Sequence, residues 1–274
     1  MLKAKMPELS PEERAMSISK YYDLPVPELE PLQVQLLQRP LSEENITRPE
    51  DVASLIRPEG YTGYDYGYCM MSDGAGYVAT YTHFRNCTLD MLKWWFAWLN
   101  TKPKNMPEGK GNIKYKVWCP YGHWDHGLAD DGSGSVVPRA CEALDLGEDG
   151  DPYDNIYMHD LDVRDFGVTQ ETLDRLNEMG CTYGINYETF DYPGAHFCMS
   201  MMRPHPNGGV EGFGREWMGY TVRDGKLVRD EATPVDEAFL KKVVKHCTIE
   251  MMRLDAILPA IYAEYHDQPL DGAL

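Results

Sequence analysis

The feature that most constrains the fold is a long helical pattern near the C-terminal end of the chain, over residues 233–259. Thr233 can serve as the N-cap, Pro234 suits the first helical position, and Asp236 completes a capping box. Pro259 is expected to end or kink the helix. Apolar residues recur at helical spacing between these limits, at Val235, Phe239, Val243, Cys247, Leu254, Ile257 and Leu258. A helix with such a face requires a sheet or other helices to cover it.

Most of the sequence before this helix is predicted as strands, with a few helices between them. Thr88–Thr101 is expected to be a buried helix capped by its first residue, and residues 171–180 a short helix closed by Gly180. Asp224 and Gly225 predict a hairpin turn. The predicted strands lie within residues 60–84, 113–120, 136–146, 155–163, 185–205 and 217–230.

This order of elements predicts an α+β fold, with a curved antiparallel sheet wrapped on the long C-terminal helix. Residues 1–60 read as an irregular or partly helical lead-in. Ser10 and Glu13 form a capping box there, and a second short helix is expected within residues 41–56.

The charge balance excludes several classes of partner. The chain has 26 basic and 44 acidic residues, a formal net charge of −18. Such a chain repels phosphate backbones and anionic lipid, so neither nucleic acid nor a membrane surface is expected as a partner. We find no run of 18 apolar residues and no apolar core of a signal peptide. Seven scattered cysteines without a C-x-x-C pair suggest buried thiols in a reducing cytoplasm.

His246 and Glu250 are the first candidate for chemistry. They lie four apart on the predicted C-terminal helix, which places them on one face with about 6 Å between their Cβ atoms. An imidazole and a carboxylate at that spacing can bind one divalent cation. The alternative is an ordinary i,i+4 pair on a solvent-exposed face.

Two further segments carry histidines. His123 and His126 lie three apart in a turn that contains glycine and aspartate, just after the predicted strand at residues 113–120. A strand end can hold ligands rigidly, although such a segment can also be an ordinary polar loop. His205 lies between two prolines and precedes Tyr220, which falls in a predicted strand. Its unperturbed pKa of about 6.5 suits a general acid or base, but a turn histidine is the simpler reading.

Taken together, these segments resemble the phloretin hydrolase and diacetylphloroglucinol hydrolase family, which cleaves the carbon–carbon bond between a phenolic ring and an acyl group. The resemblance rests on three motifs in a shared order: Y-K-x-W-x-P-x-x-H at Tyr115–His123, R-x-W-x-G-Y at Arg215–Tyr220 after His205, and H-x-x-x-E at His246–Glu250. It covers roughly residues 85–260.

The resemblance implies one zinc ion per chain, held by two histidines and two glutamates. His123, His246 and Glu250 match three of these ligands. We choose Glu142 as the fourth, because its predicted strand can hold a carboxylate firmly beside His123. Glu148 and Asp154 are rivals, and the family spacing favours a position later than Glu142. The residues alone also suit iron or manganese.

The resemblance also implies roles in substrate binding and catalysis. Tyr115 and Tyr220 match the substrate-binding tyrosines of the family, and His205 matches its catalytic histidine. His126 stands where the family has an asparagine, a departure that can alter recognition of the ring. The implied substrate is a small phenolic ketone of the phloretin or acylphloroglucinol type.

The fold implied by the resemblance is a helix-grip fold like that of the Bet v 1 plant allergens, in agreement with the pattern of elements. We therefore expect an N-terminal extension over residues 1–80, with contacts in a homodimer, and a catalytic helix-grip domain over residues 81–274. Two other functions remain open. A helix-grip binding protein for hydrophobic ligands needs no metal, and a metal-dependent oxygenase needs iron and oxygen.

Overall fold

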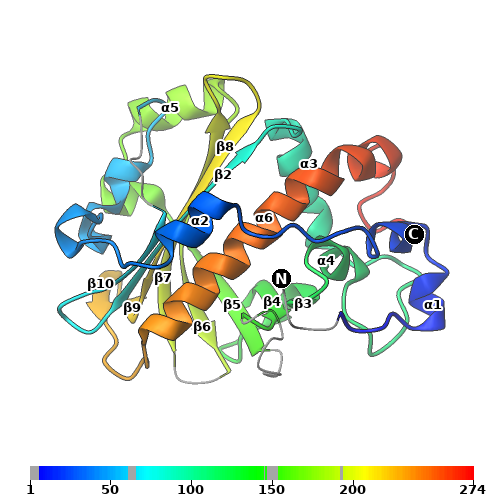
Figure 1. Ribbon diagram of the computed structural model, residues 1–274, viewed down its shortest axis with the longest axis horizontal. Helices are drawn as coiled ribbons and strands as arrows, with labels where there is room; N and C mark the ends of the chain where they lie inside the picture. The colour runs from blue at the N-terminus through cyan, green and yellow to red at the C-terminus, as the bar shows by residue number, and fades with distance from the viewer. Residues whose placement is uncertain (1–5, 61–65, 145, 147–153, 192–193) are drawn as a thin grey trace.

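Figure 1 shows the chain, in a computed structural model, as a large antiparallel sheet with a long helix running diagonally across one face. The structure describes residues 6–60, 66–144, 146, 154–191 and 194–274. The expected mixture of an antiparallel sheet and a long C-terminal helix is confirmed. None of the helices in these ranges is both long enough and apolar enough to cross a membrane.

Eight strands form the main sheet, in the order β1-β2-β8-β7-β6-β5-β4-β3, and every neighbouring pair is antiparallel. Two further strands, β9 and β10, form a hairpin whose turn residues Asp224 and Gly225 have φ angles of 51° and 70°. Positive φ at both positions is the reason an Asp-Gly pair suits this turn. The strands are β1 (Gly67–Met70), β2 (Gly76–Phe84), β3 (His123–Asp130), β4 (Val136–Glu142), β5 (Asp154–Leu161), β6 (Thr182–Phe190), β7 (Ala195–Pro204), β8 (Val210–Met218), β9 (Tyr220–Arg223) and β10 (Lys226–Arg229).

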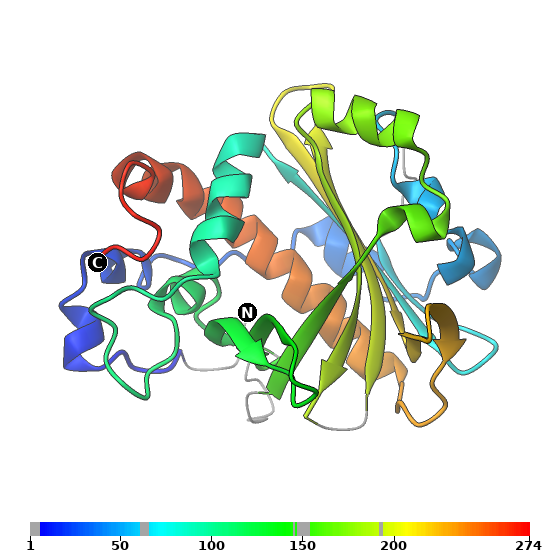
Figure 2. The same ribbon diagram turned by 180° about the vertical axis from the view of Figure 1, so that it is seen from behind.

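The helices lie on both faces of this sheet. Helix α6 packs on one face, against β1 and β2. Helix α5 and the segment around η3 cover the other face, around a second core that contains Val52, Leu176 and Trp217 (Figure 2). The helices are α1 (Pro11–Arg14), η1 (Ser17–Tyr21), α2 (Pro31–Leu36), η2 (Glu43–Asn45), η3 (Pro49–Leu55), α3 (Leu89–Leu99), α4 (Ile113–Trp118), η4 (Val163–Phe166), α5 (Gln170–Glu178) and α6 (Glu237–Tyr265).

Helix α6 begins later and ends later than predicted. Its N-cap is Asp236, whose side chain accepts a hydrogen bond from the backbone N–H of Phe239, so the prediction of Thr233 is wrong. The helix does not end at Pro259 but continues to Tyr265. Proline cannot donate to the carbonyl four residues earlier. That carbonyl, on Asp255, accepts instead from the thiol of Cys87 at 3.9 Å.

Residues 113–118 form helix α4, although their alternating pattern predicted a strand. A strand would have placed Lys114 and Lys116 together on a solvent-facing side. Both lysines are buried instead, and both have acceptors. The Nζ of Lys114 donates to the backbone oxygen of Trp98 at 2.9 Å, and the Nζ of Lys116 donates to Glu13 at 2.6 Å. The lysines therefore stabilise a short buried helix, which alternation alone does not indicate.

Several predicted elements are confirmed. Thr88 caps α3, Ser10 and Glu13 form the capping box of α1, and Gly180 follows α5 with a φ of 70°. The second short helix expected within residues 41–56 corresponds to two 3-10 segments, η2 and η3. Residues 61–65, at the start of the first predicted strand region, lie outside the described part of the chain.

The N-terminal residues are tied to the rest of the chain. Arg253 of α6 has no solvent exposure, and its guanidinium donates to backbone carbonyls of the N-terminal segment and of α4. Strands β1 and β2 are hydrogen-bonded into the main sheet. The division at residue 80 falls inside β2, and the role of residues 1–80 as a separate extension stays a prediction.

Candidate metal centre

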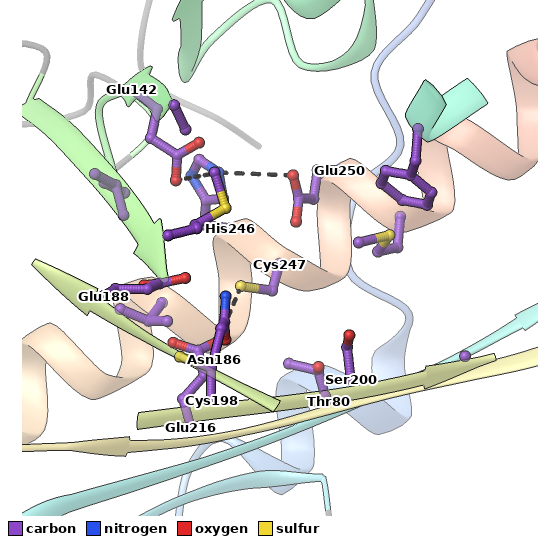
Figure 3. A pocket seen from close by; sticks show the side chains of 18 of the residues that line it. Thr80, Glu142, Asn186, Glu188, Cys198, Ser200, Glu216, His246, Cys247 and Glu250 are labelled. Atoms are coloured by element: carbon purple, nitrogen blue, oxygen red, sulfur yellow. Dashed lines mark hydrogen bonds and ion pairs between the residues drawn. The ribbon is translucent and has the colours of Figure 1, made fainter. Parts of the chain in front are cut away.

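Four polar side chains converge where the edge of the sheet meets α6. His123 opens β3 and is the direct strand partner of Glu142, the last residue of β4. His246 and Glu250 lie on successive turns of α6 and face the same region. Figure 3 shows Glu142, His246 and Glu250 directed toward one another across this gap. Helical spacing on one element and strand pairing on two others thus bring the predicted ligands together.

The distances between these side chains suit one small cation. The Nε2 of His123 lies 3.2 Å from the Nε2 of His246, 3.5 Å from Glu142 Oε2 and 3.1 Å from Glu250 Oε2. The Nε2 of His246 lies 3.7 Å from Glu142 Oε1 and 3.9 Å from Glu250 Oε2. Ligand atoms about 2.0–2.2 Å from a tetrahedral ion lie roughly 3.3–3.6 Å apart. The measured separations are close to this range.

The electrostatics of the cluster also favour a cation. Burial raises the pKa of Glu142 to about 7. Burial also raises the pKa of Glu250 well above its ordinary value, and the nearby charge of Glu142 adds to this shift. Burial lowers the pKa of His123, so its imidazole is neutral and has a lone pair for a ligand bond. Two buried carboxyl groups beside the neutral imidazole of His123 and the ring of His246 form a donor set that a divalent cation accepts, and the positive charge of such an ion would stabilise the ionised carboxylates.

Residues around the cluster hold the predicted ligands in place. The ring of Tyr115 stacks on His123 with 3.7 Å between centroids, and its hydroxyl donates a hydrogen bond to Glu142. The indole N–H of Trp118 donates to the backbone oxygen of Glu250 at 2.8 Å. Both aromatic residues lie on α4, so the helix that was predicted as a strand supports three of the four ligands.

A cavity of about 320 Å³ opens beside the cluster. Its walls include Glu142, His246 and Glu250 on one side, and the inward-facing side chains of β6, β7 and β8 on the other (Figure 3). Apolar side chains such as Phe96 and Met251 complete the lining. The size and the mixture of apolar walls with a few polar groups are typical of a small-molecule site.

Two of the four residues predicted to act on the substrate line this cavity. Tyr115 is one, although its hydroxyl is engaged by Glu142. His126 is the other, and a β-bulge between His123 and Asp125 brings it to the same side as His123. Burial lowers the pKa of His126 to about 4, so its imidazole is neutral at neutral pH.

His205 and Tyr220 lie elsewhere. His205 follows β7, stacks on His83 at 3.8 Å and is partly exposed, and it is absent from the described residues that line the cavity. The hydroxyl of Tyr220 donates to Asp73, and its ring belongs to the core on the other face of the sheet. His205 lies beyond the end of β7, and Tyr220 points away from α6. These positions explain why neither side chain lines the cavity.

Two of the three carboxylates predicted for the fourth ligand, Glu142 and Asp154, lie in the described part of the chain. Glu142 joins the two histidines, and each of these three residues offers an atom within 4.8 Å of the other two. Asp154 is the strand partner of Glu142 on β5 and is not part of this cluster in the described ranges. Glu148 lies outside the described residues.

The sequence reasoning missed the polar side chains on the sheet side of the cavity. His196 is buried there, and its Nδ1 lies 3.7 Å from Glu188 Oε2. Glu216 and Asn186 line the same wall. Their alternation in the sequence could have indicated these residues, since polar residues at every second position of β6 and β7 share one face of the sheet.

Comparisons with known proteins identify the family of this chain. The chain is 23% identical to a phloretin hydrolase of Eubacterium ramulus over 93% of both chains. It is 29% identical over 91 residues to a 2,4-diacetylphloroglucinol hydrolase of a Pseudomonas species, a match that covers 32% of this chain and 28% of that protein. The family model described as DAPG hydrolase PhiG domain matches residues 46–263. The chain therefore belongs to the DAPG hydrolase PhiG domain family.

Proposed function

We propose that this protein is a metal-dependent hydrolase that cleaves the bond between a polyhydroxylated phenol ring and an acyl group. The products are a phenol and a carboxylic acid. The observation that supports this most strongly is the convergence of His123, Glu142, His246 and Glu250 beside a phenol-sized cavity, whose wall includes the last three of these residues. The names of the relatives, phloretin hydrolase and 2,4-diacetylphloroglucinol hydrolase, support the substrate class.

The chemistry sets two requirements. An aryl ketone resists hydrolysis because the departing group would be an aryl carbanion. Protonation of the ring carbon, through the keto tautomer of a ring hydroxyl, removes this obstacle. Water must then add to the acyl carbon, so that the carbon–carbon bond breaks, the electron pair returns to the ring as it regains aromaticity, and the acyl group leaves as the acid. The enzyme must therefore supply a proton donor at the ring and an activated water at the carbonyl.

The four ligands would hold one divalent cation, which supplies a Lewis acid at the acyl end of the cavity. We favour zinc, because two imidazoles and two carboxylates at these separations suit a tetrahedral ion. The same donors also accept iron or manganese. Tyr115 contributes by positioning Glu142, and its ring forms part of the cavity wall.

We assign the proton transfer to His196 rather than His205. His196 is buried in the cavity wall, and Glu188 lies 3.7 Å from its Nδ1, where a carboxylate can orient the imidazole. His205 stacks on His83 outside the cavity lining. His126 is neutral and partly buried beside Tyr115, and it can hydrogen-bond a ring hydroxyl.

The wider architecture is also part of the proposal. The sheet that packs on α6 supports a helix-grip fold of the Bet v 1 type, in which the ligand lies between sheet and helix. Contacts of residues 1–80 in a homodimer remain a proposal that measurement of the oligomeric state can test.

One incubation tests the function directly. The protein is mixed with phloretin, with monoacetylphloroglucinol and with diacetylphloroglucinol, and the released acid is measured by chromatography. We expect the acid and the deacylated phenol to form in equal amounts from at least one of the three ketones. If no acid forms from any of them, the proposed activity is wrong.

A further inference from the structure

Three polar side chains form a straight row on the sheet side of the cavity. Asn186 of β6 is the direct strand partner of Cys198 on β7, and Cys198 is the direct partner of Glu216 on β8. Residues directly opposite each other in adjacent strands share a face of the sheet. All three line the cavity, and Figure 3 shows them across from Glu142 and Glu250.

Glu216 is an unusual member of this row, because the described part of the chain gives it no cationic partner. Among the described residues, no lysine or arginine forms an ion pair with its carboxyl group, and the neighbours that influence it are Glu188, Glu142 and the thiol of Cys247. The Cys247 thiol donates to Glu216 Oε1 at 3.5 Å. Burial raises the pKa of Glu216 to about 8, and the charge of Glu188 adds to the shift. The raised pKa favours the protonated form of this carboxyl group, which has one O–H to donate.

We propose that Glu216 determines specificity by donating a hydrogen bond to the ring oxygen farthest from the acyl group. This inference rests on the proposed function. The predicted ligands take the acyl end, and Glu216 lies on the opposite wall of the same cavity. A flat ring between these walls directs its para position toward Glu216.

The chemistry of the ring explains why a neutral acid suits this position. In the keto tautomer a ring oxygen becomes a carbonyl, which accepts hydrogen bonds but cannot donate them. A carboxylate would repel that oxygen, whereas a carboxylic acid can donate to it. A ring without the para hydroxyl would leave the partly buried acid without this acceptor, and such a loss reduces affinity.

Two products separate this contact from the reaction itself. Phloroglucinol has three ring hydroxyls, and resorcinol lacks one of them, so their dissociation constants report the contact without any bond cleavage. Each is titrated into the purified protein and into two variants, Glu216→Met and Glu216→Gln. We expect the parent protein to prefer phloroglucinol about tenfold. Glu216→Gln keeps an N–H donor and the preference, whereas Glu216→Met binds the two phenols equally.

The inference is overturned if Glu216→Met keeps the parent's preference, or if the parent protein has none. If Glu216→Met does not fold, the test of the contact is the preference for phloroglucinol over resorcinol in the parent protein and in Glu216→Gln. Different outcomes test the contact and the proposed activity. A parent protein that prefers phloroglucinol but releases no acid from the ketones supports the contact and contradicts the hydrolase. Release of acid from the ketones, together with an unchanged preference for phloroglucinol in Glu216→Met, supports the hydrolase and contradicts the contact.

Discussion

The Nε2 atoms of His123 and His246 lie 3.2 Å apart, although 123 positions separate the two residues in the chain. Two ring N–H groups cannot point at each other at that distance, so at least one nitrogen presents its lone pair. With Glu142 and Glu250 within 4 Å of these nitrogens, the pair forms the centre of a donor set directed at one point. This relationship joins the sheet, helix α6 and the cavity into one proposed site.

Replacing Tyr115 with phenylalanine tests how the ligands are positioned. The variant keeps the ring that stacks on His123 but loses the hydroxyl that donates to Glu142. We expect the affinity for zinc to fall about 10–100-fold, as is typical when the hydrogen-bond partner of a ligand is removed. The measurement is a competition titration with a chromogenic chelator. Tyr220→Phe is the matched control, because its hydroxyl donates to Asp73 away from the cavity. Equal affinities in the two variants would count against this role of Tyr115.

Replacing His196 with asparagine tests the proton donor. The change removes the imidazole from the cavity wall beside Glu188 but keeps a polar side chain. We expect kcat for the ketone that the parent hydrolyses to fall about 10²–10⁴-fold, with the metal content unchanged. His205→Asn provides the comparison. The structure predicts near-normal turnover for that variant, and the opposite pattern would return the role to His205.

The overall fold was largely predictable because its strongest patterns are local. The spacing of apolar residues around Val243 and Leu254 identifies α6, and the Asp224-Gly225 pair identifies the β9–β10 hairpin. The exceptions depend on tertiary contacts. The acceptors of the buried lysines lie far away in sequence, as Glu13 does for Lys116, so residues 113–118 looked like a strand. Past Pro259, α6 continues, and the carbonyl of Asp255 that proline leaves without a donor accepts from the distant thiol of Cys87.

The site was predictable only in part, for a similar reason. The ligand types and the four-residue spacing of His246 and Glu250 can be read from the chain, and they predicted one half of the cluster. The other half follows from the register of β3 and β4, which brings Glu142 opposite His123. The row that ends at Glu216 follows from the register of three strands, and no local pattern specifies it.

A substitution at Gly122 tests the close packing beside the proposed metal ligands. A Cβ atom at this position would lie 2.8 Å from Cε1 of His246 and 3.1 Å from the backbone oxygen of Ala143. We expect Gly122→Ala to lower the free energy of unfolding by about 1–3 kcal/mol, measured by urea denaturation, because the imidazole must shift. Gly127→Ala in the same strand region is the control, since its nearest neighbour would be 3.8 Å away. Equal stability of the two variants would contradict this reading.

Arg253 connects the N-terminal segment to α6, the helix that carries two of the proposed ligands. Its guanidinium donates to the backbone carbonyls of Tyr21, Tyr22, Leu24, Pro25 and Val117. Arg253→Met would leave these acceptors without their donor, so the free energy of unfolding is expected to fall by about 3 kcal/mol or more. The exposed Arg164 pairs with Asp162, and Arg164→Met should change stability by less than about 0.5 kcal/mol. A similarly small effect for Arg253→Met would show that this connection adds little.

The central claim is that four residues bind one cation on which the cleavage of a phenolic ketone depends. The most direct measurement is turnover of phloretin or diacetylphloroglucinol by protein stripped with a chelator, before and after one equivalent of zinc is restored, with metal content determined by mass spectrometry. We predict about one ion per chain in the active protein, loss of acid release on stripping, recovery on addition, and neither binding nor recovery in His246→Ala. Full turnover by the metal-free protein would contradict the account.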